Sequence, residues 1–165
     1  MQLIVRKDYE SITVQDLLDK ADIGRSTFYA HYAGKDDLLR KGFEQLRTEL
    51  TAACNDSGPA PLAFSSAMFA HAERYKDIYR ALVGGRGNSI ILGEIRRVLL
   101  ESVEPQLKRT GKNDAPTELL ARYVVDAFQS VLTWWLERRP DLSSEQIDRM
   151  FRQLVVPSLK SRQTG

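Results

Sequence analysis

A run of thirteen residues, from Ile23 to Lys35, combines hydrogen-bond donors with a complete lack of Asp and Glu. The whole chain holds Asp+Glu 22 in 165 residues, so this gap is a local bias in charge. Donor side chains without neighbouring carboxylates suit contact with phosphate oxygens and the edges of bases. The run therefore predicts a nucleic-acid-binding surface. The alternative is a polar helix face that is merely solvated.

Two short helices must position these donors. Thr13 before a helix at Val14–Ala21, with Asp16 three residues later, is typical of a capping box. Residues 22–24 form a short turn, and a second helix is expected at about Arg25–Tyr32. This spacing predicts a helix-turn-helix, in which the second helix enters the major groove of DNA.

The rest of the chain shows helical spacing, and signals for strands are weak. We expect an all-α fold, with an N-terminal helix-turn-helix head at 1–39 and a helical-bundle body at 40–165. Further helices are expected at about Lys35–Ala53, Leu62–Glu73, Lys76–Val83, Ser89–Leu107, Thr117–Arg139 and Ser144–Leu159.

Bulk composition is compatible with many partners. Lys+Arg 24 against Asp+Glu 22 gives a net charge of +2, which neither demands nor excludes nucleic acid. A single cysteine rules out an internal disulfide bond. No apolar run approaches the ~18 residues of a membrane span, and no signal peptide is apparent. We expect a cytoplasmic protein without a membrane partner.

Catalytic and metal-binding patterns are not found in the sequence. His71 lies near Glu73, but no second His or Cys stands at ligand spacing. Cys54 has no evident activating partner, which favours an incidental thiol. We therefore expect no catalytic residue, no metal and no cofactor. An all-helical enzyme stays as an alternative, although it lacks a set of nucleophile, base and orienting residue.

The segments Thr13–Ala21, Arg25–Tyr32 and Lys35–Leu39 resemble, in order and spacing, the DNA-binding signature of the TetR family of bacterial transcription regulators. The resemblance covers about Leu3–Leu39 and implies a double-stranded DNA operator as partner. It implies backbone contacts from Thr13, Thr27, Tyr29, His31 and Lys35, and positions near base edges for Arg25, Ser26 and Ala30. Lys35 could hold a phosphate at the start of its helix. The family acts mostly by repression.

Three departures from the family pattern stand out. Asp8 and Asp22 replace usual glycines, and Asp tolerates a left-handed backbone. Gly24 replaces a usual serine cap, at a cost of only a few tenths of a kcal/mol. The first amphipathic helix of the pattern is reduced to Leu3–Lys7, so we expect a truncated head. A start codon assigned too late, or an omitted upstream segment, would account for it. A helical adaptor that has lost DNA binding is the corresponding alternative.

The helix expected at Thr117–Arg139 carries two apolar stripes, which require two packing partners. The resemblance implies a four-helix homodimer interface built from the last two helices, which two-fold symmetric half-sites also favour. The alternative is burial of both stripes in a monomer core. The predicted interface residues are Tyr123, Ala127, Trp134, Ile147, Met150, Phe151 and Leu154.

A ligand pocket is expected within the body, and it would suit a small apolar or aromatic effector. Its predicted lining is Phe64, Met68, Tyr79, Ile95, Leu99 and Phe128. For each of these residues an ordinary place in the core is the alternative. Effector binding would change the spacing of the two heads, so that they no longer fit successive major grooves.

Overall fold

The computed structural model describes residues 3, 7, 9–56, 62–84, 89–110 and 115–159, and all the regular structure within them is helical. The elements are η1 (Tyr9–Ser11, a 3-10 turn), α1 (Val14–Ala21), α2 (Arg25–His31), α3 (Lys35–Asp56), α4 (Ala63–Arg74), α5 (Lys76–Gly84), α6 (Ser89–Thr110), α7 (Thr117–Arg138) and α8 (Ser144–Leu159). The predicted all-α fold is confirmed. Helix ends depart from the predicted ones by three residues or fewer, and η1 was not predicted.

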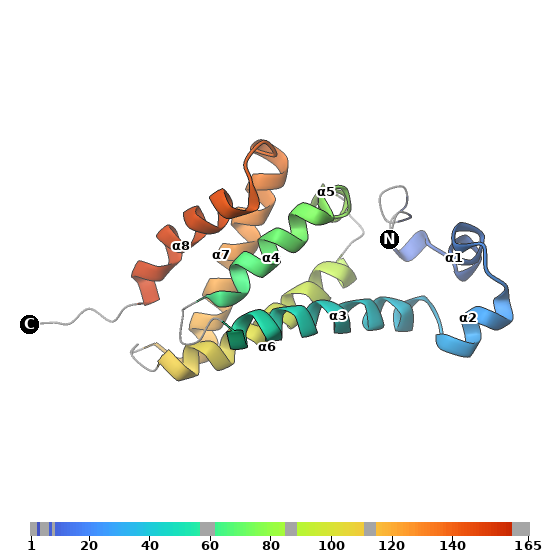
Figure 1. Ribbon diagram of the computed structural model, residues 1–165, viewed down its shortest axis with the longest axis horizontal. Helices are drawn as coiled ribbons and strands as arrows, with labels where there is room; N and C mark the ends of the chain where they lie inside the picture. The colour runs from blue at the N-terminus through green and yellow to red at the C-terminus, as the bar shows by residue number, and fades with distance from the viewer. Residues whose placement is uncertain are drawn as a thin grey trace, which may run out of the picture.

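The long helix α3 joins two parts of different build (Figure 1). At its N-terminal end lie η1, α1 and α2, which we call the head. Along its C-terminal half it packs against α4 and α6, which belong to a bundle completed by α5, α7 and α8. We call this bundle, with the C-terminal half of α3, the body. The boundary predicted at residue 39 lies inside α3, which continues from the head into the body.

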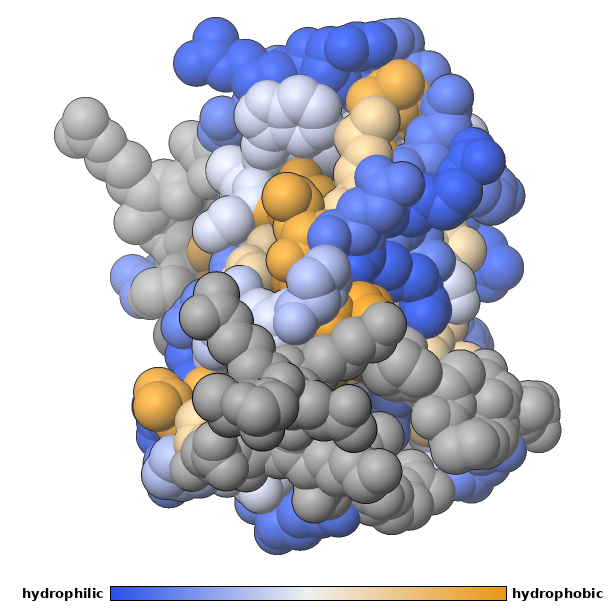
Figure 2. Space-filling view, turned by 90° about the vertical axis from the view of Figure 1, so that its left-hand side faces the viewer, coloured by the Kyte–Doolittle hydropathy of each residue, from blue (hydrophilic) through white to orange (hydrophobic). Residues whose placement is uncertain are grey.

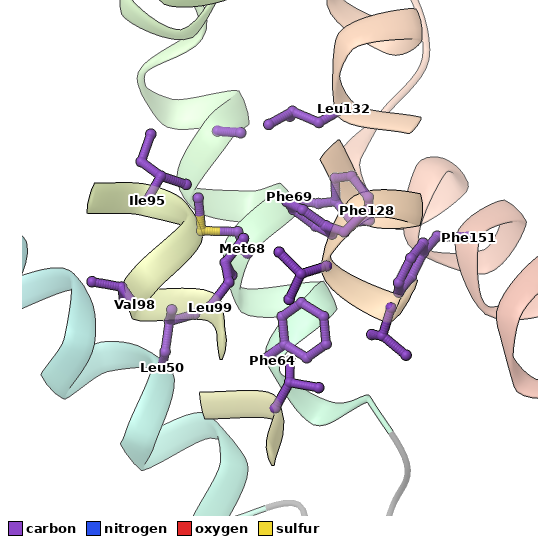
Figure 3. Close-up of a cluster of buried hydrophobic side chains, with 14 of the residues drawn as sticks. Leu50, Phe64, Met68, Phe69, Ile95, Val98, Leu99, Phe128, Leu132 and Phe151 are labelled. Atoms are coloured by element: carbon purple, nitrogen blue, oxygen red, sulfur yellow. The ribbon is translucent and has the colours of Figure 1, made fainter. Parts of the chain in front are cut away.

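Aromatic side chains from α4, α7 and α8 form the centre of the body (Figure 3). Phe69 and Phe128 lie 4.5 Å apart between ring centroids, and Phe64 and Phe151 pack edge-on at 6.2 Å. All four rings are fully buried. Burial of each such side chain contributes about 1.5–3 kcal/mol, so this cluster makes a large contribution to the stability of the body.

Four residues of the predicted effector lining lie in the packed core, and a ligand role for them stays a prediction. Phe64, Met68, Leu99 and Phe128 have no exposed surface and pack against one another or against neighbouring core side chains. Helical periodicity identifies a face as buried, but it does not distinguish a packed core from the wall of a cavity. These residues belong to the core.

Two residues of the predicted dimer face are buried within the protomer. Ile147 and Phe151 are fully buried within the protomer, because α8 turns this side towards α4 and α7. The other side of α8 is exposed, with Leu154 at 67% and Met150 at 40%. On α7, Trp134 is 43% exposed. The apolar surface of α7 and α8 is therefore confined to one side of each helix.

Exposed apolar residues of both α7 and α8 border one groove. A shallow groove between the two helices is lined by Ser130, Val131, Trp134, Met150, Gln153 and Leu154. Figure 2 looks onto the end of the molecule that carries α8, and shows apolar atoms gathered in a strip between polar surfaces. Tyr123 is exposed on α7, whereas Ala127 is half-buried. A dimer at this face stays a prediction.

Polar contacts hold α8 on α4. Glu73 of α4 accepts a hydrogen bond from the hydroxyl of Ser144 (2.7 Å), where α8 begins. Further along, Asp148 accepts from Ser65 and from Nε of Arg152 (2.7 Å). The carboxylate of Glu73 is thus engaged at the start of α8. These contacts fix which side of α8 faces outward.

Candidate nucleic-acid interface

The turn between α1 and α2 is built from local signals. Thr13 and Asp16 form the predicted capping box, with the amide of Thr13 donating to the Asp16 carboxylate at 2.8 Å. Asp22 ends α1 in the left-handed conformation (φ 53°, ψ 48°), which Asp adopts more readily than most residues. The amide of Ile23 donates to the carbonyl of Leu18 at 3.2 Å. The predicted cap and turn are therefore confirmed.

Helix α2 presents one side inward and its donors outward. Phe28 is 2% exposed and packs its ring 5.4 Å from that of Tyr32. Gly24 is the N-cap, and its carbonyl accepts from the amide of Phe28 at 3.1 Å. The six α2 residues predicted to meet DNA are all exposed, namely Arg25, Ser26, Thr27, Tyr29, Ala30 and His31. The structure brings them together on one surface, and their contacts with DNA stay a prediction.

Arg25 is oriented by a residue that the sequence did not single out. Its Nη2 donates to Oε1 of Gln15 on α1 at 3.2 Å. Gln15 in turn donates to Asp19 at 2.7 Å along the same helix. The guanidinium is thereby held near the start of α2, and α1 contributes to the same surface. Thr13 is also exposed, although its hydroxyl takes part in the capping box.

The amino group of Lys35, predicted to contact a phosphate, is engaged within the protein. Nζ donates to the carbonyls of Tyr9, Glu10 and Ile12 at 3.0, 3.0 and 2.9 Å. It also lies 4.8 Å from the centre of the Tyr9 ring. Three acceptors match the three donors of an ammonium group. Lys35 therefore fastens η1 to α3, and its contact with a phosphate stays a prediction.

Carboxylates occupy the start of α3, where the helix dipole favours negative charge. Asp37 accepts from the amide of Ala33 at 3.0 Å, and this hydrogen bond lowers the pKa of its carboxyl group. Asp36 accepts from the hydroxyl of Tyr9 at 2.5 Å. Burial, with the bond to Asp36, raises the pKa of Tyr9, so its hydroxyl remains a donor. The protein's own carboxylates thus fill this helix end.

Lys41 anchors the other end of α2, a role that sequence reasoning missed. Its Nζ donates to the carbonyl of His31 at 2.7 Å and lies 5.0 Å from the centre of the Tyr32 ring. A lysine at a helix C-terminus is favourable to the helix dipole. No local signal could have shown it, because Lys41 follows α2 by ten residues and reaches it only through the bend before α3.

A further ion pair ties the opening residues to α1. Nζ of Lys7 donates to Oδ1 of Asp16 at 2.7 Å. This bond, with those from Thr13, lowers the pKa of Asp16 to about 2. The Asp16 side chain therefore serves both as a capping group and as an ionic partner.

A cavity of about 190 Å³ lies where the head meets the body. Its lining residues are Leu3, Tyr9, Ile12, Leu17, Lys35, Leu38, Leu39, Gly42, Phe43, His71, Tyr75, Ile78, Tyr79 and Ile95. Of the predicted effector residues, Tyr79 and Ile95 are among them. The hydroxyl of Tyr79 and Nδ1 of His71 share a hydrogen bond at 3.0 Å.

The described residues show neither a metal-binding cluster nor a membrane-spanning helix. They contain no group of three or more His, Cys, Asp or Glu side chains arranged to hold a metal ion. None of the helices in this part of the chain has both the length and the apolarity that crossing a bilayer requires.

Comparisons with known proteins agree with the helix-turn-helix. Residues 1–45 match the family model described as "Bacterial regulatory proteins, tetR family". Residues 61–156 match the model of the "Transcriptional regulator C-terminal region". The two models together extend over both the head and the body.

Individual relatives point to the same family. A TetR transcriptional regulator from Streptococcus agalactiae 2603V has a similar crystal structure, with a TM-score of 0.70 and 29% identity over 93% of this chain and 87% of that one. The HTH-type transcriptional repressor DhaR of Mycobacterium sp. (strain GP1) is 21% identical over 93% of this chain and 87% of its own. The uncharacterized HTH-type regulator YxbF of Bacillus subtilis (strain 168) is 40% identical over 48 residues, which are 29% of this chain and only 13% of that protein. With both family models matched and the fold shared, the chain belongs to the TetR family of transcriptional regulators.

Proposed function

We propose that this chain is a sequence-specific transcriptional repressor that binds its operator as a homodimer and leaves it when a small effector binds. The observation that carries the proposal is the exposed, acid-free outer side of α2, which is held at both ends by contacts from α1 and α3. The place of action is the cytoplasm, where the operator DNA lies.

The residues of α2 divide into two roles by their chemistry. Arg25, at the start of the helix and oriented by Gln15, is suited to a bidentate contact with a guanine edge. Tyr29 and His31 offer donors further along, which suit phosphate oxygens. A bidentate arginine contact discriminates between bases by about 1–3 kcal/mol, whereas phosphate contacts set the register.

Two copies of α2 are needed to read two half-sites. TetR-family regulators bind operators as dimers, and their two recognition helices enter major grooves about 34 Å apart. The exposed face of α7 and α8 supports such a dimer, because Trp134, Met150 and Leu154 lie next to one another on it. A strip of this kind, bounded by polar surface, is typical of a protein interface.

We propose repression instead of activation because the relative DhaR is a repressor. Release by an effector requires that the ligand bind more tightly to the form with low DNA affinity. The cavity between head and body supports this step, since its walls come from both parts.

The proposal is tested by binding of the purified protein to a labelled DNA fragment from upstream of its own gene. We expect retardation that an unlabelled copy reverses, that random DNA does not reverse, and that weakens as salt rises. The Arg25→Ala variant should bind about 10- to 100-fold more weakly and discriminate less between sequences. Lys108→Ala, which removes a positive charge from the exposed part of α6, is the control and should bind like the parent.

The dimer is tested by Leu154→Arg, which places a charge on the proposed interface. We expect a monomer in sedimentation and a loss of cooperative binding to the two half-sites. Ala70→Arg, on the exposed side of α4, should stay dimeric. A parent protein that is monomeric at the concentrations that occupy DNA would contradict the dimer.

The two alternatives make different predictions. A helical adaptor without DNA binding would show no preference for any duplex over random competitor. An all-helical enzyme would turn over a substrate, and this activity would survive Arg25→Ala. Preferential binding to one fragment, together with its loss in Arg25→Ala, supports the repressor against both.

A further inference from the structure

The cavity between head and body takes its walls from elements that are far apart in sequence. The head contributes Leu17 of α1 to the wall, and α3 contributes Leu38 and Phe43. Ile78 of α5 and Ile95 of α6 close the side of the body. A molecule in this cavity would therefore touch both parts of the protein at once. None of the exposed residues of the α7–α8 face takes part in it.

The size of the cavity defines the size of its occupant. Its volume is about 190 Å³. A cavity of about 150 Å³ lined by Leu, Ile and Phe holds benzene, so one substituted benzene ring is the matching size here. The walls are mainly aliphatic and aromatic side chains, which favour an apolar body for the ligand.

One polar pair interrupts the apolar walls. Nδ1 of His71 and the hydroxyl of Tyr79 lie 3.0 Å apart, on α4 and α5. Burial lowers the pKa of His71 and raises that of Tyr79, so both groups are neutral at neutral pH. Each group can exchange donor and acceptor roles with the other. The pair can thus hydrogen-bond to a neutral hydroxyl or carbonyl group.

The charge of the cavity walls opposes an ionic ligand. Lys35 is the one charged residue among the described residues that line the cavity. Its amino group is engaged by the carbonyls of Tyr9, Glu10 and Ile12. An anion in the cavity would lose its hydration without gaining a free cationic partner, which costs several kcal/mol.

We propose that this cavity is the effector site, and that it binds a small, neutral, mainly apolar molecule, about the size of a substituted benzene ring, whose polar group hydrogen-bonds to His71 and Tyr79. The proposal rests on the proposed function, because an effector has meaning only for a regulator. By filling the space between Leu17 and Ile78, the ligand fixes one angle between head and body. Since each dimer carries two heads, a change of this angle alters the spacing of the two α2 helices.

The ligand class is tested by calorimetric titration of the full-length protein with phenol, toluene and benzoate. Phenol and toluene have the same size, and they differ in one hydroxyl group. We expect both to bind, with phenol about 2- to 10-fold tighter because of one additional hydrogen bond. Benzoate should not bind. Failure of both neutral probes to bind at millimolar concentration would overturn the proposal, as would binding of benzoate alone.

The location is tested by substitutions at two glycines with equal space. A side chain at Gly42, in the wall of the cavity, meets no heavy atom within 4 Å at its Cβ, and the same holds for Gly93 of α6, which lies outside the lining. Gly42→Leu should abolish phenol binding, whereas Gly93→Leu should bind phenol like the parent. Tyr79→Phe should keep toluene binding and remove the preference for phenol. Unchanged phenol binding in Gly42→Leu would place the site elsewhere.

The role as an effector site is tested with the operator fragment. At saturating phenol we expect the operator Kd to rise at least fivefold, and phenol affinity to fall by the same factor when operator is bound, as linkage requires. This rise should be absent in Gly42→Leu. Operator and phenol binding that are independent of each other would overturn this inference and leave the repressor intact. Phenol binding without any sequence-specific DNA binding would instead contradict the proposed function.

Discussion

The head and the body of this protein are stabilised by different means. Polar groups fasten the head to α3: Lys35 and Lys41 of α3 bind backbone carbonyls of the head, and Tyr9 binds Asp36. In the body, a cluster of buried aromatic rings joins α4, α7 and α8. The head buries few large side chains in its described residues, with Phe28 as the largest of those in α1 and α2.

This difference follows from what each part must do. A surface that meets DNA has to stay exposed, so α2 cannot gain stability by burying both of its sides. Hydrogen bonds to defined atoms fix its position, at a modest net contribution of about 0.5–1.5 kcal/mol each. The body has no such constraint on its inner sides and is stabilised by apolar burial. The head should therefore be the part that opens or shifts first.

The largest expected effect belongs to the core of the body. Phe128→Ala should lower the free energy of unfolding by about 3–5 kcal/mol, because it leaves a cavity among Phe64, Phe69 and Phe151. Leu119→Ala, at a side chain that is 58% exposed, should change it by less than about 0.5 kcal/mol. Urea unfolding at a fixed protein concentration measures both. A loss below about 1 kcal/mol for Phe128→Ala would refute the contrast between the two parts.

A smaller effect, confined to the head, is expected for Lys35→Met. Loss of three charge-assisted hydrogen bonds should speed amide exchange in η1 and α1 about 10- to 100-fold and leave α7 unchanged. DNA affinity should fall for all sequences, without a change in its salt dependence, because no phosphate contact is lost. Arg40→Met, with a side chain that is 62% exposed, is the control for exchange in the head. If Lys35→Met instead released about one ion fewer on binding DNA, as judged from the slope of log affinity against log salt, Lys35 would contact a phosphate.

Acid should loosen the head through Asp16. The bond from Lys7 lowers the pKa of Asp16 to about 2, against about 4 in an unfolded chain. Its folded carboxylate therefore stabilises α1 above pH 4, and this stabilisation is lost as the pH falls towards 2. Amide exchange across α1, followed through this pH range, should report this loss of stability in the parent. The same loss should be absent in Asp16→Asn, which has no carboxylate to protonate. An identical pH response in the two proteins would mean that Asp16 does not control the stability of α1.

The smallest effect is expected at the cap of α2. Gly24 has extended backbone (φ −71°, ψ 152°), and an added Cβ would meet Ser26 Oγ and Thr27 Oγ1 at 3.9 Å, an ordinary contact. Gly24→Ser should supply the missing side-chain cap and stabilise α2 by a few tenths of a kcal/mol. Gly24→Ala adds the Cβ without the hydroxyl, so it should not show this stabilisation. Equal thermal stability of the two variants would show that the cap contributes nothing.

Local signals explain why the α1–α2 unit could be predicted almost residue by residue. The Thr13–Asp16 capping box and the left-handed Asp22 depend on neighbours within four residues, so their types and spacing are sufficient. The same holds for α8, where the amide of Ser143 donates to Gln146 at 2.9 Å. The contacts of Lys35 could not be predicted for the opposite reason, since its acceptors lie 23–26 residues earlier in the chain.

By itself, the sequence determined the helices, their caps and the acid-free exposed side of α2, because helix propensity, capping and periodicity act over a few residues. Only the tertiary structure decided which apolar stripe was inside. Periodicity shows that Phe151 and Leu154 lie on an apolar helix, but only packing against α4 and α7 buries the first and exposes the second. The cavity between head and body is likewise a product of packing, since its volume is the space left when side chains from distant elements meet.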